Sequence, residues 1–376
     1  MKTMKLIAAE RVDRPRETSR AARTPTTAGG AMSRLKTLFR RYAAPVYRAM
    51  RPFWRRIMFR RNVRYDASRY RRWSAAFQAS FRTRDDLPHL RALITMDYHR
   101  IEKGLALRHP RPAFGQQVVR ELARNTAAYA RLGGDPELLR IVGNVLRAYI
   151  DYHDLEHIDL GGFRSEVAEL IAKLNAAEDP CGCGGTRNVT RDEWLRFDRS
   201  ALPDFFLTRS SVRDFTDEPV DDEVVERIVR FAMKTPSVCN RQAWRVYDIS
   251  KSDLLTNILS CQNGNAGFRE AIPRAFIVAC DLRHFVSVGE RNQGWIDGGM
   301  FAMSLLWAIH AEGLGACPLN WSVEKEADQK LRLFAPIPDH EIVLMMIAFG
   351  HVPDTFRVAQ SPRKPLSEIW TCLTDE

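Results

Sequence analysis

The sequence predicts an α+β protein in which an all-helical N-terminal region precedes a region that mixes helices and strands. Three observations predict it. The apolar spacing between residues 66 and 180 is helical, and from about Leu202 short β-rich runs alternate with helices. The longest apolar run, residues 342–349, has the length of a buried strand. No apolar run is long enough to span a bilayer.

The C-terminal region contains four candidate strands and three candidate helices. Turn and breaker residues separate the other segments: Gly133 and Gly134 end one helix, Pro110 and Pro112 break another, and residues 179–185 form a linker. These changes predict a leader over residues 1–65, a helical region over 66–200 and a mixed domain over 201–376. The strands are expected at 244–249, 275–280, 316–321 and 342–349, and the helices at 221–233, 299–312 and 324–333.

The positive charge is concentrated in the leader. The 376-residue chain has a formal net charge of +11, but residues 1–65 alone carry +15 and the remaining residues −4. From Ser33 onward, aromatic and aliphatic residues interleave with arginines, with breaks expected at Pro45 and Pro52. This basic amphipathic stretch, residues 33–65, suits an anionic membrane surface. The alternatives are nucleic acid, and a solvated arm whose apolar side packs on the rest of the protein.

Cysteines and histidines give weak evidence for a metal. The chain has seven cysteines, an odd number scattered through apolar segments, which predicts a reducing cytoplasm and no disulfide framework. Cys181 and Cys183 lack two further soft ligands, and His153 and His157 are interpreted as a solvated helix surface. No metal site is therefore expected. The polar run from His99 to Gly104 is interpreted as a helix end with a glycine stop, although a pocket wall is an alternative.

Three polar clusters in the C-terminal region suggest chemistry. Arg209 and Arg213, with two serines between them, offer bidentate and single donors to one anionic group. The segment 236–242 places amide side chains at a helix-to-strand junction, which suits a heteroaromatic ring that both donates and accepts. A basic turn around Arg363 and Lys364 follows near the end. Neither a G-x-G-x-x-G nor a G-x-x-x-x-G-K-[ST] motif occurs in the sequence.

In this order the clusters resemble the nitroreductase family of FMN-dependent oxidoreductases. The resemblance covers residues 207–369, under half of the chain, and rests on short motifs. These are Arg209-Ser-Ser-Val-Arg213-Asp-Phe, Pro236-Ser-Val-Cys-Asn-Arg-Gln-Ala-Trp244, Asp297-Gly-Gly, Gly313-Leu-Gly-Ala-Cys and Ser361-Pro-Arg-Lys-Pro. It implies a central, mainly antiparallel sheet flanked by helices, and an obligate homodimer with FMN in clefts between the subunits.

The resemblance also implies roles for individual residues. The phosphate and ribityl chain of FMN would be contacted at 209–213 and at the basic turn, and the partner subunit would supply 236–242 beside the flavin. The turn after the third strand would face the reactive edge of the ring. The implied FMN-binding residues are Arg209, Ser210, Ser211, Arg213, Pro236, Ser237, Val238, Asn240, Gln242, Asn265, Pro318, Leu319, Asn320, Trp321, Arg363 and Lys364.

The implied activity is a ping-pong reaction in which NAD(P)H reduces FMN and a small acceptor then reoxidises it. No catalytic side chain is expected, because the flavin carries the chemistry. Many relatives have Glu-Gly where this chain has Asn320-Trp321, so the indole either narrows the cleft or belongs to the core. An alternative function is a flavin-binding accessory or sensor protein without turnover. The helical half and basic leader are similar to extended nitroreductases of polysaccharide biosynthesis, where membrane association would fit.

Overall fold

The computed structural model describes residues 44–77, 86–174 and 183–374. The chain separates into two compact units, Met1–Arg61 and Asn62–Glu376. Helix α2 (Ala44–Trp73) crosses this division and continues through Pro52, so the break expected at Pro52 is wrong. The break expected at Pro45 stays a prediction, because the described residues begin at Ala44. Pro45 stands in the first turn, where an absent N–H is no loss. Residues 33–43 of the predicted amphipathic stretch lie outside the described residues.

A four-stranded antiparallel sheet organises the second unit. Its strand order is β1-β2-β4-β3, so β2 and β4 are central while β1 and β3 form the edges. Every residue of β2 is buried, as expected for a central strand covered on both faces. The strands are β1 (Trp244–Ser250), β2 (Arg274–Asp281), β3 (Gly315–Asn320) and β4 (Glu341–Gly350).

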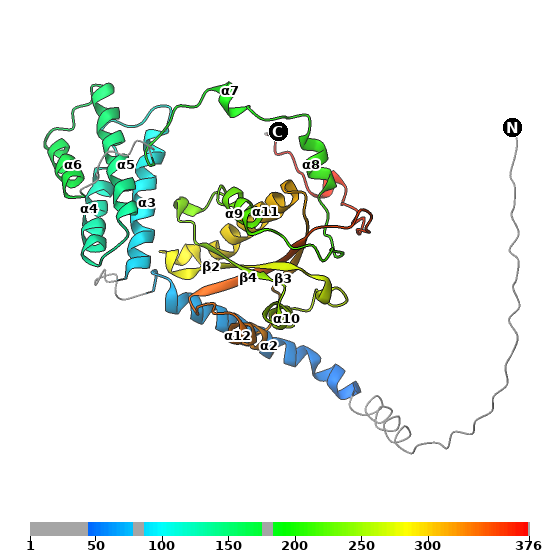
Figure 1. Cartoon of the computed structure of the whole chain (residues 1–376). Coiled ribbons are helices and arrows are strands. Elements are labelled where there is room, and N and C mark those ends of the chain that lie inside the picture. The colour runs from blue at the N-terminus through cyan, green and yellow to red at the C-terminus, as the bar shows by residue number, and fades with distance from the viewer. Residues whose placement is uncertain (1–43, 78–85, 175–182, 375–376) are drawn as a thin grey trace, which may run out of the picture. The chain divides into compact units, whose positions relative to one another are not determined.

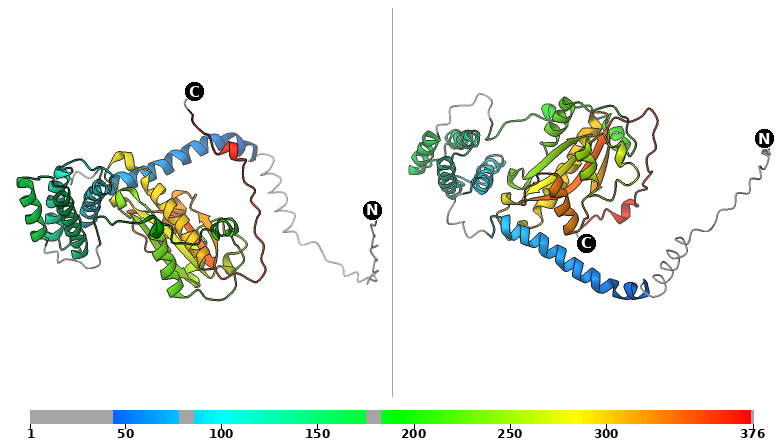
Figure 2. Two further views of the ribbon diagram at one scale, coloured as in Figure 1. Left: turned by 90° about the horizontal axis from the view of Figure 1, so that it is seen from above. Right: turned by 60° about the horizontal axis from the view of Figure 1, so that its bottom comes forward.

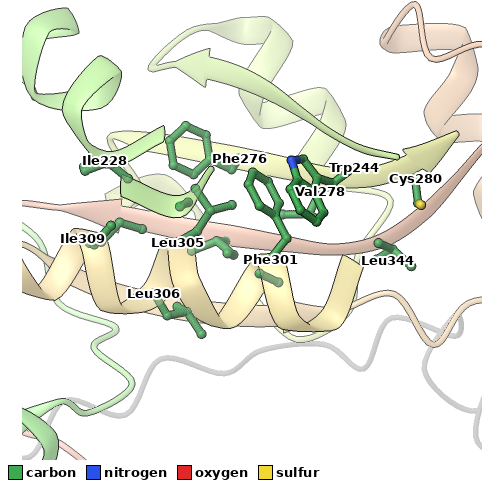
Figure 3. Packing of buried hydrophobic residues seen from close by; sticks show 14 of the residues in the cluster. Ile228, Trp244, Phe276, Val278, Cys280, Phe301, Leu305, Leu306, Ile309 and Leu344 are labelled. Atoms are coloured by element: carbon green, nitrogen blue, oxygen red, sulfur yellow. The ribbon is translucent and has the colours of Figure 1, made fainter. Parts of the chain in front are cut away.

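Helices cover both faces of this sheet (Figure 1). Helices α9 (Asp222–Ala232) and α11 (Gln293–Ala311) pack on one face, and α10 (Asp253–Leu259) and α12 (Lys325–Phe334) pack on the other. On the first face the rings of Trp244 and Phe301 stack with centroids 4.9 Å apart (Figure 3). Helix α11 comes so close to β4 that a Cβ at Gly298 would lie 1.9 Å from a methyl of Leu344.

The helical region forms a separate bundle with its own apolar core (Figure 2). His153 is buried there, and its Nδ1 lies 2.7 Å from the carbonyl oxygen of Tyr149. His157 lies beyond the end of the helix with a φ of 55°, so the expectation that both histidines form a solvated helix surface is wrong. The helices of the bundle are α3 (Leu87–Leu105), α4 (Gln116–Arg131), α5 (Pro136–Leu155) and α6 (Gly162–Lys173).

The predicted fold class, an antiparallel sheet flanked by helices after a helical N-terminal region, is confirmed. The four strands match their predicted ranges to within one or two residues. Helix α11 begins six residues before the predicted 299–312, since the sequence reasoning took Gly298 and Gly299 for its start. Three short helices were missed: α7 (Arg191–Trp194), α8 (Leu202–Thr208) and α10. The boundary expected near residue 200 stays a prediction.

Candidate functional site

The segment 209–213 runs along the outer side of edge strand β3. The amide N–H of Val212 donates to the carbonyl oxygen of Ala316 at 2.9 Å, and Ser211 forms an isolated parallel bridge with the same residue. The Val212 side chain is buried, while Arg209, Ser210 and Ser211 are half-buried and Arg213 is exposed. The backbone therefore fixes a short row of guanidinium and hydroxyl groups at this edge.

Neither arginine of this row has a carboxylate partner among the described residues. The Arg209 guanidinium lies 5.8 Å from the ring centroid of Trp307 in α11. The Arg213 guanidinium reaches only the carbonyl oxygen of Ser211, at 3.5 Å. Two cations that no described carboxylate neutralises can pair with an anionic ligand.

The second cluster, residues 236–242, forms a strained loop that leads into β1. Cys239, Asn240 and Gln242 all have positive φ values, between 48° and 53°. Such a conformation costs a non-glycine residue on the order of 1 kcal/mol, and it clusters at ligand-binding sites. Within the loop, the Ser237 hydroxyl accepts the Gln242 amide N–H at 2.9 Å, and the Gln242 side chain donates to Asn240 at 3.2 Å.

Two acidic residues just before and inside α11 hold this loop. The fully buried Asp297 accepts the Val238 amide N–H at 3.1 Å and the side-chain amide of Gln293 at 2.8 Å. Burial raises the pKa of the Asp297 carboxyl. Glu290 forms a two-pronged ion pair with the buried Arg241, with contacts of 3.2 Å and 2.5 Å. Burial alone would raise the pKa of Glu290, but this ion pair and two backbone N–H groups hold it below its usual value.

The sequence reasoning assigned no function to either acid. Asp297 was recorded only as part of a motif, and Glu290 was missed because it lies about fifty residues from the loop it holds. A buried acid near the start of an apolar helix was the available signal for Asp297, since such a group needs a partner.

The two clusters lie at opposite edges of the sheet within one chain. Residues 209–213 flank β3, whereas 236–242 lead into β1, and the order β1-β2-β4-β3 puts these strands at the two ends. The order of the strands therefore does not bring the two clusters together.

Asn265 and the turn at the end of β3 are occupied by internal contacts. The buried Asn265 donates to the Leu259 carbonyl oxygen at 2.7 Å and accepts from Arg269 at 2.8 Å. Leu319 is buried in the core and Pro318 is half-buried, while Asn320 is exposed. The side chain of Asn265 therefore stabilises its own loop through these hydrogen bonds.

Trp321 lies in the apolar core on the face of the sheet that α10 and α12 cover. Its indole N–H donates to the Asp328 carboxylate at 3.1 Å, and its ring packs in the apolar cluster between the sheet and α10 and α12. Of the two interpretations of this residue, the core one agrees with these contacts.

The basic turn near the C-terminus belongs to an exposed segment, since every residue from 354 to 374 is exposed. Arg363 donates to the carbonyl oxygen of its neighbour Ser361 at 2.6 Å, and Lys364 pairs with Glu368 at 3.1 Å. Among the described residues neither side chain has a polar contact with the row at 209–213.

The fold and the site define an α+β protein that presents guanidinium and hydroxyl side chains at the edge of an antiparallel sheet. The sequence profile of the Nitroreductase family matches residues 207–266. An inferred NADH dehydrogenase/NAD(P)H nitroreductase of Methanothermobacter thermautotrophicus is 31% identical over 147 residues, which cover 38% of this chain and 73% of that protein. The chain therefore belongs to the nitroreductase family, as the motifs predicted.

Other relatives are more distant. The FMN reductase (NADPH) of Bacillus subtilis is 25% identical over 179 residues, covering 44% of this chain and 70% of that protein. A crystal structure of an inferred nitroreductase in complex with FMN, from Desulfovibrio desulfuricans, is 24% identical. That comparison covers 48% of this chain and 100% of the other, with a TM-score of 0.40.

Proposed function

We propose that the protein is an FMN-dependent oxidoreductase that transfers hydride from NAD(P)H through FMN to a small acceptor in a ping-pong reaction. One observation carries the proposal: Arg209 and Arg213 flank two serine hydroxyls along the edge of β3 and have no carboxylate partner among the described residues. A phosphate monoester is a dianion, and guanidinium groups bind it with two parallel hydrogen bonds. The names of the FMN reductase relatives support this choice of ligand.

The residues present fit FMN in chemical type. Guanidinium and hydroxyl donors at 209–213 would hold the phosphate, and the amides of Asn240 and Gln242 would meet the edge of the ring. Bound FMN supplies reversible acceptance of a hydride, and the protein supplies binding and orientation. The strained loop 236–242 is anchored by a contact within the chain, because Asp297 accepts the Val238 N–H. Such pre-organisation reduces the ordering cost of binding.

A homodimer would complete this site. Helix α11 leaves Trp295, Ile296, Met300 and Met303 exposed on one side, although its other side is packed in the core. The segment 354–374 exposes further apolar side chains, among them Ile369 and Trp370. A second copy that covers these surfaces would bring its own loop 236–242 toward the row at 209–213, which one chain leaves at the far edge. We expect Met303→Glu to shift the chain to monomer in light scattering and to weaken FMN binding.

The competing proposal is a flavin-binding sensor without turnover. The two are distinguished by adding NADH or NADPH to the FMN-loaded protein without oxygen. An oxidoreductase bleaches the yellow absorbance within seconds, and an added acceptor such as a quinone restores it. Colour that persists with both nicotinamides would contradict the enzyme and favour the sensor.

The leader supports a second proposed partner, an anionic membrane surface. Among the described residues no helix is both long and apolar enough to cross a bilayer. In the N-terminal half of α2, however, exposed apolar side chains recur at spacings of three and four residues, which places them on one helix face. These are Val46, Met50, Phe53, Trp54 and Ile57. Residues 46–61 also contain six arginines and no acidic residue. This combination is typical of helices that lie in the headgroup layer.

Matched double variants test this partner. Phe53→Ser with Trp54→Ser removes part of the apolar face, whereas Phe59→Ser with Val63→Ser removes two exposed apolar side chains from the other side of the helix. The first variant should lose sedimentation with vesicles containing anionic phosphatidylglycerol, and the second should keep it. Equal loss in both, or binding to DNA but not to vesicles, would contradict the membrane proposal.

A further inference from the structure

A pocket of about 520 Å³ lies in the helical region, and none of its lining residues is among those proposed to bind FMN. It opens between the last two turns of α3 and the connection from α3 to α4. Its size falls within the roughly 300–1,000 Å³ that small-molecule sites occupy. The segment matched by the Nitroreductase family begins at residue 207, after this region.

One wall of the pocket is apolar and held in place. Phe114 lies against α3 where Gly104 has no side chain: a Cβ at Gly104 would be 2.1 Å from the Phe114 ring. This close approach, rather than a helix stop, is what Gly104 provides, because its φ is not in the left-handed region and α3 continues to Leu105. The Phe114 ring also packs edge-on against Tyr149, whose hydroxyl donates to the Phe114 carbonyl oxygen at 2.5 Å.

The rest of the lining is cationic. Arg100 and Lys103 come from α3 and Arg111 from the connection, and among the described residues the lining contains no carboxylate. Arg100 is partly neutralised by Asp97 at 3.2 Å. Lys103 and Arg111 have no ion pair within the described part of the chain. Two unpaired cations and a third that is partly paired, around one cavity, attract a dianion.

The apolar wall suggests what the anion is attached to. Leu107, Pro110 and Pro112 line the pocket together with Phe114, and Leu107 is 62% exposed in the chain alone. These side chains offer contact to a ring or an alkyl group beside the cations. We propose that this pocket binds an organic phosphate, with the phosphate at Lys103, Arg111 and Arg100 and the organic part against the apolar wall. The proposal does not depend on flavin chemistry.

Phenyl phosphate is a suitable probe, titrated by calorimetry into the FMN-loaded protein in a phosphate-free buffer. We expect it to bind at least tenfold more tightly than inorganic phosphate or phenol. The double variant Lys103→Gln with Arg111→Gln should weaken binding at least tenfold. The matched control is Arg131→Gln with Lys173→Gln, two exposed cations of the same helical region, and it should bind as the wild type does.

A further variant separates the two parts of the pocket. Leu107→Ser should weaken binding of phenyl phosphate several-fold and leave binding of inorganic phosphate unchanged. Absence of binding to the wild type, equal loss in both double variants, or release of FMN during the titration would overturn the proposal. The last result would mean that the probe competes at the flavin site.

Discussion

Replacing Asp297 by alanine tests how the strained loop is held. In the wild type the Asp297 carboxylate accepts the half-buried N–H of Val238 at 3.1 Å and the Gln293 amide at 2.8 Å. Alanine leaves both donors without this acceptor, and an unsatisfied donor costs about 1–3 kcal/mol when it is buried. Removing a buried charge whose pKa is raised by burial offsets part of this cost. We therefore expect the free energy of unfolding to fall by about 1–2 kcal/mol, the lower part of that range.

Asp297→Asn is the control for this prediction. Its side-chain oxygen can still accept the Val238 N–H, and Gln293 can turn its amide to accept from the new NH₂ group. Urea unfolding should therefore give Asp297→Asn a stability within about 0.5 kcal/mol of the wild type, as for changes that preserve buried hydrogen bonds.

A thiol in the loop gives a local readout. Cys239 is half-buried in the loop and has a φ of 48°. Once Asp297→Ala releases Val238, the loop should open more often, and a thiol reagent should modify Cys239 faster by peptide mass mapping. Exposed Cys183 and Cys372 serve as internal references. Unchanged Cys239 reactivity, or an Asp297→Asn variant as unstable as the alanine variant, would refute this account.

Three further predictions concern other residues. Burial raises the pKa of Asp97 to about 6 from 3.8, so its contribution is largest when it is protonated and is lost as the pH rises through about 6. Relative to Asp97→Asn, wild-type unfolding free energy should fall by about 1–3 kcal/mol between pH ~4 and pH ~7, and parallel pH profiles would contradict this. Trp321→Phe should cost about 1–2 kcal/mol in thermal or urea unfolding because Asp328 loses a donor; unchanged stability with faster turnover of bulky acceptors would instead mean that the indole narrows the cleft. Cys239→Gly should raise the unfolding free energy by up to about 1 kcal/mol by relieving a positive φ, and a lower value in urea unfolding would show that the thiol side chain stabilises the loop.

Much of the fold could be predicted because its elements have regular periodicity. The strand β4 is a continuous apolar run, and α9 repeats its apolar residues at helical spacing, so both were found from local pattern alone. Helix α8 was missed because its seven residues are too few to show a period, and it lies among exposed residues. Periodicity also does not show where a helix bends or passes a proline. The continuity of α2 through Pro52 could therefore not be predicted from the sequence pattern.

Only part of the candidate site could be predicted, because only some of its residues are adjacent in the sequence. The motif at 209–213 carries its chemistry in adjacent residues, so it was visible in the sequence. Asn265 and Trp321 were selected by position in the family pattern, yet their side chains are engaged by Leu259 and Asp328, contacts that only the folded chain reveals. His153 was misjudged for the same reason. Its neighbours in sequence are charged, but the helix turns it toward the core.

The most direct test of the central claim compares FMN with riboflavin, which lacks the phosphate. Arg209→Gln with Arg213→Gln is the test variant, and Arg230→Gln, an exposed arginine of α9 paired with Glu226, is the control. Titration by flavin fluorescence should show that the wild type and the control bind FMN at least tenfold more tightly than riboflavin, while the test variant binds both equally. Equal affinity of the wild type for FMN and riboflavin, or an undiminished preference in the test variant, would contradict the claim that this edge of β3 holds the phosphate.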